Sequence, residues 1–391
     1  MAANSPLNVI QKLHDGKFHS DEMFHKISAK YIRINRNELQ LSDQILRNVV
    51  LNMLLKHMKK EDKFFNDLFG DVNYAGSVSK SLKVYKPNEY DLNLVIRLPI
   101  NYKFLTIEPD DIHCGYVKIG AKVADNGIDA GIFSRIISGN YLDQNKFREW
   151  MHSVVQKALN SIHSESNSPV DNNSNLYIFR SRKRTYEVTC RQSNPAFTLQ
   201  VIYKAANYNV DFDLVPCLQF ENKAVEGFRQ PKGNQWIAIA KPLRVYEGNL
   251  LWRAGFYQTE KRLLKGSGQI KPIIKMFKKF RDDQGWDNIK SYYIETLFYN
   301  ELTDKDFKRE FRYFSRTSVF VYMLQRLEKH LKAKVLRNYW HKEHNLFDSV
   351  SPQYLEDLAR QLEKILSMIE LNKKDVGGLV KKDYFRKMLQ L

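Results

Sequence analysis

The sequence predicts an α+β fold in which a mixed-sheet core is followed by a helical C-terminal lobe. Residues 176–220 consist almost wholly of short segments with the composition of strands, such as YEVTC and FTLQVIY. From about Asn249 onward the apolar residues follow helical spacing. Because strands come first and helices afterwards, we expect a bilobal molecule with domains over residues 1–248 and 249–391.

A long amphipathic helix is expected over Ser42–Gly70. Ser42 or Asp43 can cap its N-terminus, and Gly70 can end it. Apolar residues at helical spacing form one stripe along it: Ile45, Leu46, Val49, Val50, Met53 and Leu54.

Three further segments follow before the strand-rich part. The segment NEYDLNLVIRLP, residues 88–99, alternates and then runs apolar like a strand. Asp143–Ile162 has an apolar side typical of a helix. The polar stretch at 164–175 is typical of a surface loop.

The composition indicates a packed globular protein, with 43% hydrophobic and 13% aromatic residues among 391. We expect no transmembrane helix, because no window approaches eighteen apolar residues in a row, and the N-terminal residues lack the layout of a signal peptide. Cys114, Cys190 and Cys217 lie far apart, which argues against a disulfide framework and against a four-ligand zinc site. A reducing, cytoplasmic location is therefore expected.

The formal net charge of +18 predicts a polyanionic partner. The alternative is a charge that serves solubility alone. The distribution favours a partner, since residues 261–281 contain eight Lys or Arg and no acid. A second basic cluster consists of Arg180, Arg182, Lys183 and Arg184.

Paired carboxylates are the strongest chemical signal. Glu89 and Asp91 lie two apart in an apolar strand, so both side chains project from one face. Two such carboxylates need a cation to stay ionised, and hard oxygen ligands suit Mg²⁺ or Mn²⁺. Asp211 and Asp213 repeat the arrangement in the segment VDFDLV. Three carboxylates from two neighbouring strands can hold two metal ions.

A candidate phosphate cradle lies upstream at Gly76 and Ser77. Glycine lets the backbone approach a phosphate oxygen, and the serine hydroxyl can hold it. Gly-Ser alone is a weak signal, but twelve residues further on it is followed by Glu-x-Asp in an apolar strand. Three lysines lie in the intervening loop, where a ligand could order it: Lys80, Lys83 and Lys86.

The stretch GSVSKSLKVYKPNEYDLNLVI resembles cyclic GMP-AMP synthase of the Mab-21 nucleotidyltransferase family, including the Pro-Asn-Glu-aromatic-Asp run at 87–91. The segment DLVP at 213–216 is similar to the family's third metal-binding strand. Gapless alignment favours Asp213 over Asp211 as the third ligand. The resemblance therefore implies two Mg²⁺ or Mn²⁺ ions on Glu89, Asp91 and Asp213.

Later segments extend the resemblance to about residue 375. LWRAGFYQTEKRLL is similar to the family segment that contacts the nucleotide, which implies roles for Arg253 and Lys261, with Glu260 beside them. PIIKMFKKF carries Lys275 at the position of the family's phosphate-binding lysine. KSYYIETLFY places Ser291 and Tyr292 at the phosphate-binding and base-stacking positions. Solvent exposure for Lys275 and core packing for Tyr292 remain alternatives.

The family's vertebrate DNA sensor has a zinc ribbon between the segments that match Glu260 and Lys275. Here KRLLKGSGQIKPII contains neither Cys nor His, so no zinc is expected. This resembles the insect receptors, and it implies double-stranded RNA rather than double-stranded DNA as the ligand. The residues expected to contact it are Lys56, Lys59, Lys60, Lys63, Lys278, Lys279 and Arg281.

The resemblance implies an enzyme of innate immune signalling and antiviral defence. It would join ATP and GTP into a cyclic dinucleotide, in a cleft between the lobes, and could dimerise on its ligand. One alternative is a synthase of linear oligonucleotides, although its first carboxylate is normally Asp. The other is a catalytically silent Mab-21-like protein that binds nucleic acid or a partner.

Overall fold

The chain folds into two compact units in a computed structural model. The model describes residues 5–99, 101–121, 135–166, 175–181, 184–193, 195–231, 233, 235–266, 268–371 and 379–391. The sheet unit comprises Asn35–Lys80 and Lys86–Glu260. The helical unit comprises Met1–Ile34, Ser81–Tyr85 and Lys261–Leu391.

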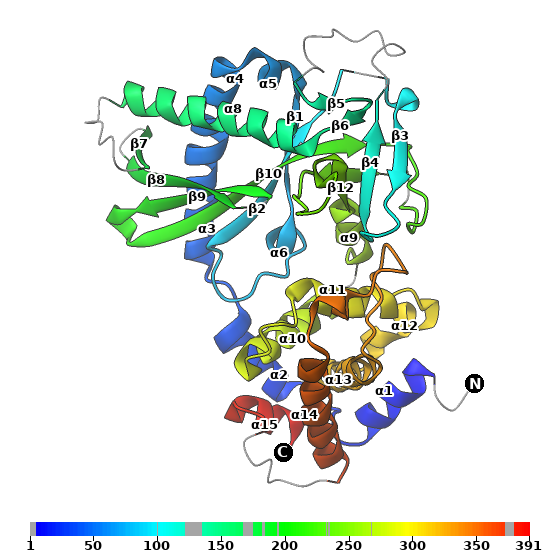
Figure 1. Cartoon of the computed structure of the whole chain (residues 1–391). Coiled ribbons are helices and arrows are strands. Elements are labelled where there is room, and N and C mark those ends of the chain that lie inside the picture. The colour runs from blue at the N-terminus through cyan, green and yellow to red at the C-terminus, as the bar shows by residue number, and fades with distance from the viewer. Residues whose placement is uncertain are drawn as a thin grey trace. The chain divides into compact units, whose positions relative to one another are not determined.

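One mixed sheet is the scaffold of the sheet unit (Figure 1). Its strands follow the order β5-β6-β4-β12-β11-β10-β9-β8-β7, while β2 pairs with β10 and β1, and β3 pairs with β4. The strands are β1 (Phe69–Tyr74), β2 (Glu89–Ile96), β3 (Thr106–Pro109), β4 (Tyr116–Gly120), β5 (Ile137–Ser138), β6 (Tyr141–Leu142), β7 (Leu176–Ser181), β8 (Arg184–Ser193), β9 (Ala196–Tyr203), β10 (Tyr208–Phe220), β11 (Trp236–Ile239) and β12 (Leu251–Gly255). The pairing of β2 with β10 is parallel, and the other pairs are antiparallel. The expected α+β class is confirmed.

The N-terminal helix differs from its prediction at both ends. It begins with α3 (Arg36–Ile45), capped by the Asn35 side chain, and continues through a π-helical segment, Leu46–Leu54, into α4 (Leu55–Glu61). Ser42 is not a cap: it is buried inside the helix, and its hydroxyl donates to the Pro87 carbonyl at 2.7 Å.

Asp62 breaks this helix before its predicted end. Its backbone is extended, and its side chain caps the short α5 (Lys63–Leu68) by accepting from Phe65 N at 2.9 Å. The chain then enters β1, so Gly70 lies in a strand rather than ending a helix.

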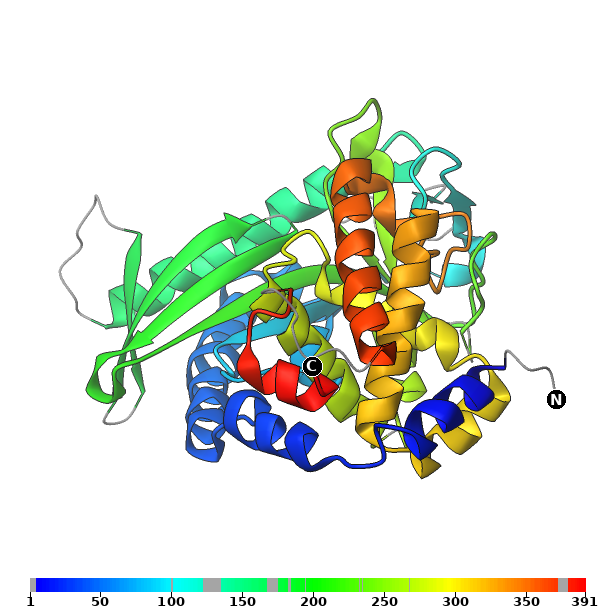
Figure 2. The same ribbon diagram turned by 90° about the horizontal axis from the view of Figure 1, so that it is seen from below.

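The helix predicted over Asp143–Ile162 is α8 (Gln144–Glu165), which lies along the long strands (Figure 2). Asp143 caps it by accepting from the backbone N–H groups of Asn145 and Lys146. Its apolar side is buried through Phe147, Met151 and Val155, and the Phe147 ring lies 5.3 Å from that of Trp252 on β12 between centroids. Most of the expected polar loop, residues 167–174, lies outside the described residues, as do Arg182 and Lys183.

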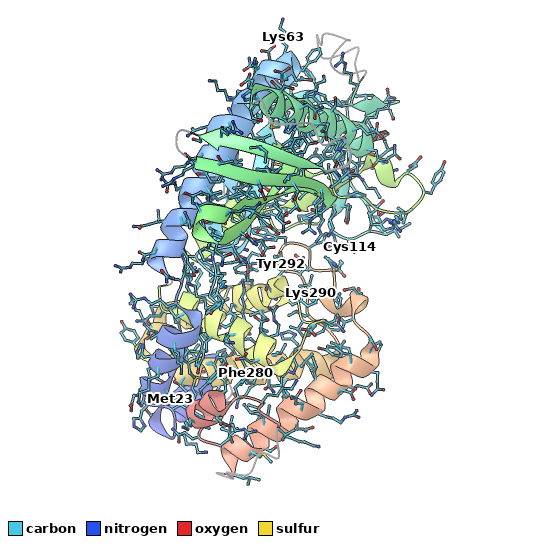
Figure 3. All side chains as sticks on the ribbon, turned by 90° about the vertical axis from the view of Figure 1, so that its left-hand side faces the viewer. Met23, Lys63, Cys114, Phe280, Lys290 and Tyr292 are labelled. Carbon is cyan, nitrogen blue, oxygen red and sulfur yellow. The ribbon has the colours of Figure 1, made fainter. Side chains whose placement is uncertain are left out.

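The helical unit combines both ends of the chain (Figure 2). Helices α1 (Pro6–Asp15) and α2 (Glu22–Ile27) pack with the C-terminal helices, α1 against α13 and α2 against α15. The C-terminal helices are α10 (Ile270–Gln284), α11 (Ser291–Glu301), α12 (Lys305–Glu310), α13 (Arg316–Ala333), α14 (Pro352–Glu370) and α15 (Asp383–Leu389). The ring of Phe280 lies among them (Figure 3), 5.0 Å from Phe385 and 5.8 Å from Phe320 between centroids. Residues 5–34 thus pack with the helical unit, whereas the sequence predicted a helical domain of residues 249–391 alone.

The sheet extends beyond Asn249, since β12 still pairs with β11 and β4. The helical pattern begins only with α9 (Tyr257–Leu263), at whose Glu260 the sheet unit ends. No helix in the described ranges is long and apolar enough to cross a membrane.

Helices α10 and α11 are joined by a buried ion pair. The Lys278 ammonium lies 2.6 Å from Glu295 Oε1, and both side chains are 5% exposed. Tyr299 donates its hydroxyl to Glu295 Oε2 at 3.1 Å. The expectation that Lys278 faces outward to a nucleic acid is therefore wrong, because an acid from the next helix neutralises it in the core.

Removing one partner of this ion pair should destabilise the protein strongly. Lys278→Met or Glu295→Leu leaves a buried charge unpaired, which costs about 3–5 kcal/mol. The double variant Lys278→Met/Glu295→Leu should lose less than either single variant, because neither charge remains. Urea unfolding of all three variants gives the comparison.

Lys332→Met is the matched control, because its ion pairs with Glu328 and Glu363 lie on the surface. It should cost under about 1 kcal/mol. A double variant whose loss equals the sum of the two single losses would contradict the buried-pair interpretation.

Candidate active site

The carboxylates of β2 and β10 lie side by side in the sheet. The two strands pair in parallel, with Glu89 opposite Asp211 and Asp91 opposite Asp213. Because side chains alternate along a strand and paired residues share a face, all four carboxylates project from the same face. The sequence predicted each pair of acids, and the register of the strands joins the two pairs.

The opposite face of the same strands is the core of the sheet unit. Tyr90 and Phe212 are fully buried there, with ring centroids 5.5 Å apart. On the acidic face Glu89 is exposed, and Asp91, Asp211 and Asp213 are half-buried. The alternation therefore holds the acids on an accessible surface by burying their neighbours.

Asp213 is held by a neighbouring hydroxyl. Thr198 lies opposite it on β9 and donates its hydroxyl to Asp213 Oδ1 at 2.5 Å. Thr198 is itself buried, and its hydroxyl lies 2.5 Å from that of Ser193. This fixes one carboxylate oxygen of Asp213. The sequence predicts only that Thr198 lies in a strand, because its partner Asp213 is fifteen residues away and no local pattern indicates the contact.

Asp211 has a different environment. An Arg191 guanidinium nitrogen lies 3.8 Å from Asp211 Oδ2. Burial raises the pKa of the Asp211 carboxyl, the Arg191 charge lowers it, and the charges of Asp213 and Glu89 raise it further. The acids of the two strands are thus close enough to repel one another.

The turn at Gly76 approaches the same site. Helix α6 (Gly76–Ser79) follows β1, and Ala75 N donates to the Asp91 carbonyl at 2.8 Å. Gly76 has a φ of +56°, and a Cβ there would lie 1.7 Å from Asp91 Oδ2. Only glycine fits on both counts. The structure therefore brings Gly76 against Asp91, with the half-buried Ser77 next in the turn.

A buried ion pair ties this turn to α9. Lys80, directly after α6, lies 3.1 Å from Glu260 Oε2, and the two side chains are 6% and 9% exposed. The sequence suggested that Lys80 lies in a loop open to a ligand, but in the structure it is buried and paired with Glu260. Because the partners lie 180 residues apart, no local pattern reveals the pair.

Arg253 lies on the same face of the sheet as the acids but further along it. It pairs with Ile239 on β11, which pairs with Cys217 on β10, four residues beyond Asp213. Its Nη1 donates to the Cys114 carbonyl at 2.9 Å, and its guanidinium lies 5.3 Å from the Tyr116 ring centroid. These contacts orient Arg253 but do not bring it to Asp213.

Four other expected nucleotide-binding residues belong to the helical unit. Ser291 and Tyr292 begin α11 (Figure 3), and the Ser291 hydroxyl accepts from Arg281 Nη1 at 3.2 Å. Lys275 is half-buried on α10, while Lys261 is exposed. Burial lowers the pKa of Lys275, and the charges of Lys271 and Lys278 lower it further.

The residues expected to bind nucleic acid fall into two groups. On the sheet unit Lys56, Lys59, Lys60 and Lys63 are exposed, and Lys63 points outward (Figure 3). Lys60 pairs with Glu165 at 2.8 Å, and the Lys59 ammonium lies 4.6 Å from the Phe69 ring centroid.

On α10 the expected cations are paired with acids. Lys279 binds Asp283 at 2.6 Å, and Arg281 pairs with Asp282 while donating to the Ile289 carbonyl at 2.9 Å. The basic run at 261–281 contains no acid of its own, but Asp283 and Asp282 just beyond it pair with Lys279 and Arg281, and Glu295 of the next helix pairs with Lys278. Three cations that were expected to face a nucleic acid are thus paired with acids instead.

The donor set suits a hard cation. Glu89, Asp91 and Asp213 offer carboxylate oxygens on one face, which is the ligand chemistry of Mg²⁺ and Mn²⁺. As the side chains stand, no group of three or more His, Cys, Asp or Glu among the described residues is arranged to hold a metal ion. The residues thus fit such a cation by chemistry and by strand position.

A glycine-serine turn packed on a strand with two acids, beside a second acidic strand, is the arrangement that the resemblance to the nucleotidyltransferases implied. Residues 78–266 match the Mab-21 protein nucleotidyltransferase domain, and residues 269–364 match the Mab-21 protein HhH/H2TH-like domain. The chain is therefore a nucleotidyltransferase, an enzyme class that generally uses divalent metal ions.

Similar proteins of known name indicate which nucleotidyltransferases this chain is related to. A cyclic GMP-AMP synthase-like receptor of Trichogramma pretiosum is 34% identical over 365 residues, which span 90% of this chain and 73% of the relative. One of Microplitis demolitor is 33% identical, over 90% of this chain and 66% of the relative. Another, of Aethina tumida, is 28% identical over 92% of this chain and 90% of the relative. The chain belongs to the cyclic GMP-AMP synthase-like receptors of the Mab-21 family.

Gly76→Ala should abolish nucleotidyl transfer, because the new Cβ forces Asp91 from its position. Gly139→Ala is the matched control: Gly139 has a φ of +60°, and nothing lies within 4 Å of its Cβ position. Both variants should lose about 1–2 kcal/mol of stability from the left-handed backbone, Gly76→Ala more than Gly139→Ala because its Cβ displaces Asp91, but only Gly76→Ala should lose activity. Turnover assays beside thermal unfolding separate the two effects. Equal activity in both variants would contradict the contact with Asp91.

Lys275→Met should stabilise the protein at neutral pH. A lysine pKa lowered in the folded state means that the charged form opposes folding at neutral pH. That penalty disappears as pH rises through the lowered pKa towards the ordinary one, so the advantage of the variant should shrink at alkaline pH. Urea unfolding at pH 7 and pH 10 measures this, with the exposed Lys364→Met as control. A variant less stable than the wild type at pH 7 would contradict it.

Proposed function

We propose that this chain joins ATP and GTP into a cyclic dinucleotide of the cyclic GMP-AMP type. The observation that carries the proposal is the register of β2 and β10, which sets Glu89 and Asp91 beside Asp213 on one accessible face. The names of the relatives support the product class. Two successive phosphodiester bonds would form, each with loss of pyrophosphate.

Glu89, Asp91 and Asp213 would hold two Mg²⁺ or Mn²⁺ ions. Such ions favour deprotonation of the attacking hydroxyl and neutralise charge on the leaving pyrophosphate. Asp213 is the better third ligand, because Thr198 orients it. Asp211 faces the competing cation Arg191.

The nucleotide would be held by a phosphate cradle and by several further side chains. Gly76 and Ser77 would cradle a phosphate, since glycine leaves room beside Asp91. The ion pair of Lys80 with Glu260 would keep that turn in place. The remaining contacts would be Arg253, Lys261, Lys275 and Ser291 on phosphates and Tyr292 stacked on a base.

Double-stranded RNA is the proposed activator, in a cytoplasmic innate immune and antiviral pathway. The exposed Lys56, Lys59 and Lys63 support a phosphate-binding surface on α4 and α5, with Lys60 shared with Glu165. On α10 Lys278 is excluded by its burial. To contact RNA, Lys279 and Arg281 would have to break their ion pairs with Asp283 and Asp282 and bind phosphates instead. Dimerisation on the ligand remains part of the proposal.

The test of the metal site compares the acids. Glu89→Ala/Asp91→Ala should abolish synthesis without unfolding the protein. Asp213→Asn should lower turnover by at least about 100-fold, and Asp211→Asn by less than about tenfold. Mass spectrometry of products from ATP, GTP and Mn²⁺, with RNA or DNA duplexes of equal length, gives the measurement. Retained turnover in the double variant would refute the mechanism, and a greater loss at Asp211 would reverse the assignment.

The same assay separates the alternatives. Linear oligonucleotides as the only product would indicate a linear synthase. Absence of any product with every duplex, from protein that binds nucleic acid, would indicate a silent binder. Activation by DNA as strong as by RNA would contradict the argument from the absent zinc ribbon.

A further inference from the structure

A basic cavity lies wholly within the helical unit. Its volume is about 680 Å³, within the roughly 300–1,000 Å³ of small-molecule pockets. The residues that close it come from the loop between α9 and α10 and from the segment that joins α12 to α13. Its polar lining includes four cations, Lys265, Lys308, Arg312 and Arg316.

No carboxylate is among the described residues that line the cavity. The acids of α12 do not serve it, because Asp306 and Glu310 both pair with Arg309, which is not a lining residue. Four like charges around one hollow repel one another and focus a positive potential into it. An anion placed there would relieve that repulsion.

Two of the cations are held in place. Arg316 Nε donates to Gln269 Oε1 at 2.8 Å, which links the start of α13 to the loop before α10. The Arg312 guanidinium lies 5.0 Å from the Tyr313 ring centroid and donates to its hydroxyl at 3.1 Å. Binding an anion would therefore immobilise fewer side chains than on a surface of flexible lysines.

The wall beside the cations is aromatic. Phe311 is buried, and Tyr313 is 64% exposed although it is large and aromatic. Both line the cavity. They offer apolar contact to a carbon skeleton next to the charges. The lining thus combines phosphate-binding groups with a surface for a ring.

We propose that this cavity binds a compact small molecule that carries several phosphate groups. The size favours such a ligand over a nucleic-acid duplex, because four cations line a single pocket of about 680 Å³. The site uses none of the residues proposed for nucleotidyl transfer.

The test uses myo-inositol hexakisphosphate as probe, titrated into the full chain by calorimetry at 0.15 M salt. One molecule should bind per chain. Lys308→Ala/Arg312→Ala should weaken binding by at least about tenfold, because two charge-assisted contacts to phosphate are lost. Lys305→Ala/Lys329→Ala removes the same charge from exposed positions outside the cavity and should change binding less than about twofold.

Three outcomes would overturn the proposal. Equal loss in both pairs would show a response to net charge alone, and absence of saturable binding would show no site. Competition by an RNA duplex whose own binding needs Lys308 and Arg312 would show a nucleic-acid surface. A further variant, Lys275→Met, should still bind the probe, because Lys275 does not line the cavity. Loss of probe binding in this variant would indicate that the probe binds at the proposed nucleotide-binding residues instead. Because the readout is binding, failure here is distinct from failure of cyclic dinucleotide synthesis.

Discussion

The parallel pairing of β2 with β10 is the constraint on which the site depends. Eight consecutive pairs, from Asp211 opposite Glu89 to Leu218 opposite Ile96, fix the register. A slip of one residue would move Asp211 and Asp213 to the buried face and bring Phe212 to the open one. Packing of Tyr90 on Phe212 opposes such a slip. The core therefore specifies the chemistry on the far side of the sheet.

The neighbours of these strands refine what the register sets. Thr198 holds Asp213 from β9, and the glycine turn lies against Asp91 from the other side. The Lys80–Glu260 pair anchors that turn to α9. Its burial makes it sensitive to loss of either partner, so two segments 180 residues apart are coupled by one interaction. The acids, the turn and Glu260 thus form one connected arrangement within the sheet unit.

The sequence predicted what depends on local periodicity and could not predict what depends on distant partners. The face shared by Glu89 and Asp91 follows from strand alternation, and α8 follows from its apolar side and the Asp143 cap. Gly70 failed as a helix end because Asp62 had already broken the helix and β1 pairs with β2. Lys278 failed as a surface cation because Glu295, seventeen residues later, lies beside it. Neither Thr198 nor Lys80 carries a local signal of its partner.

Lys275 and Lys278, one turn apart on α10, differ in what balances their charges. Lys278 is paired with Glu295 in the core, so this pair needs no ligand to balance it. Lys275 has a pKa lowered by burial and by the charges of Lys271 and Lys278, so its surroundings oppose its charge. A phosphate beside Lys275 would remove that opposition, and the free energy released would add to binding. A lysine whose charge destabilises the folded protein until an anion binds beside it is suited to bind a substrate phosphate. The charge of Lys278 contributes to this destabilisation at Lys275.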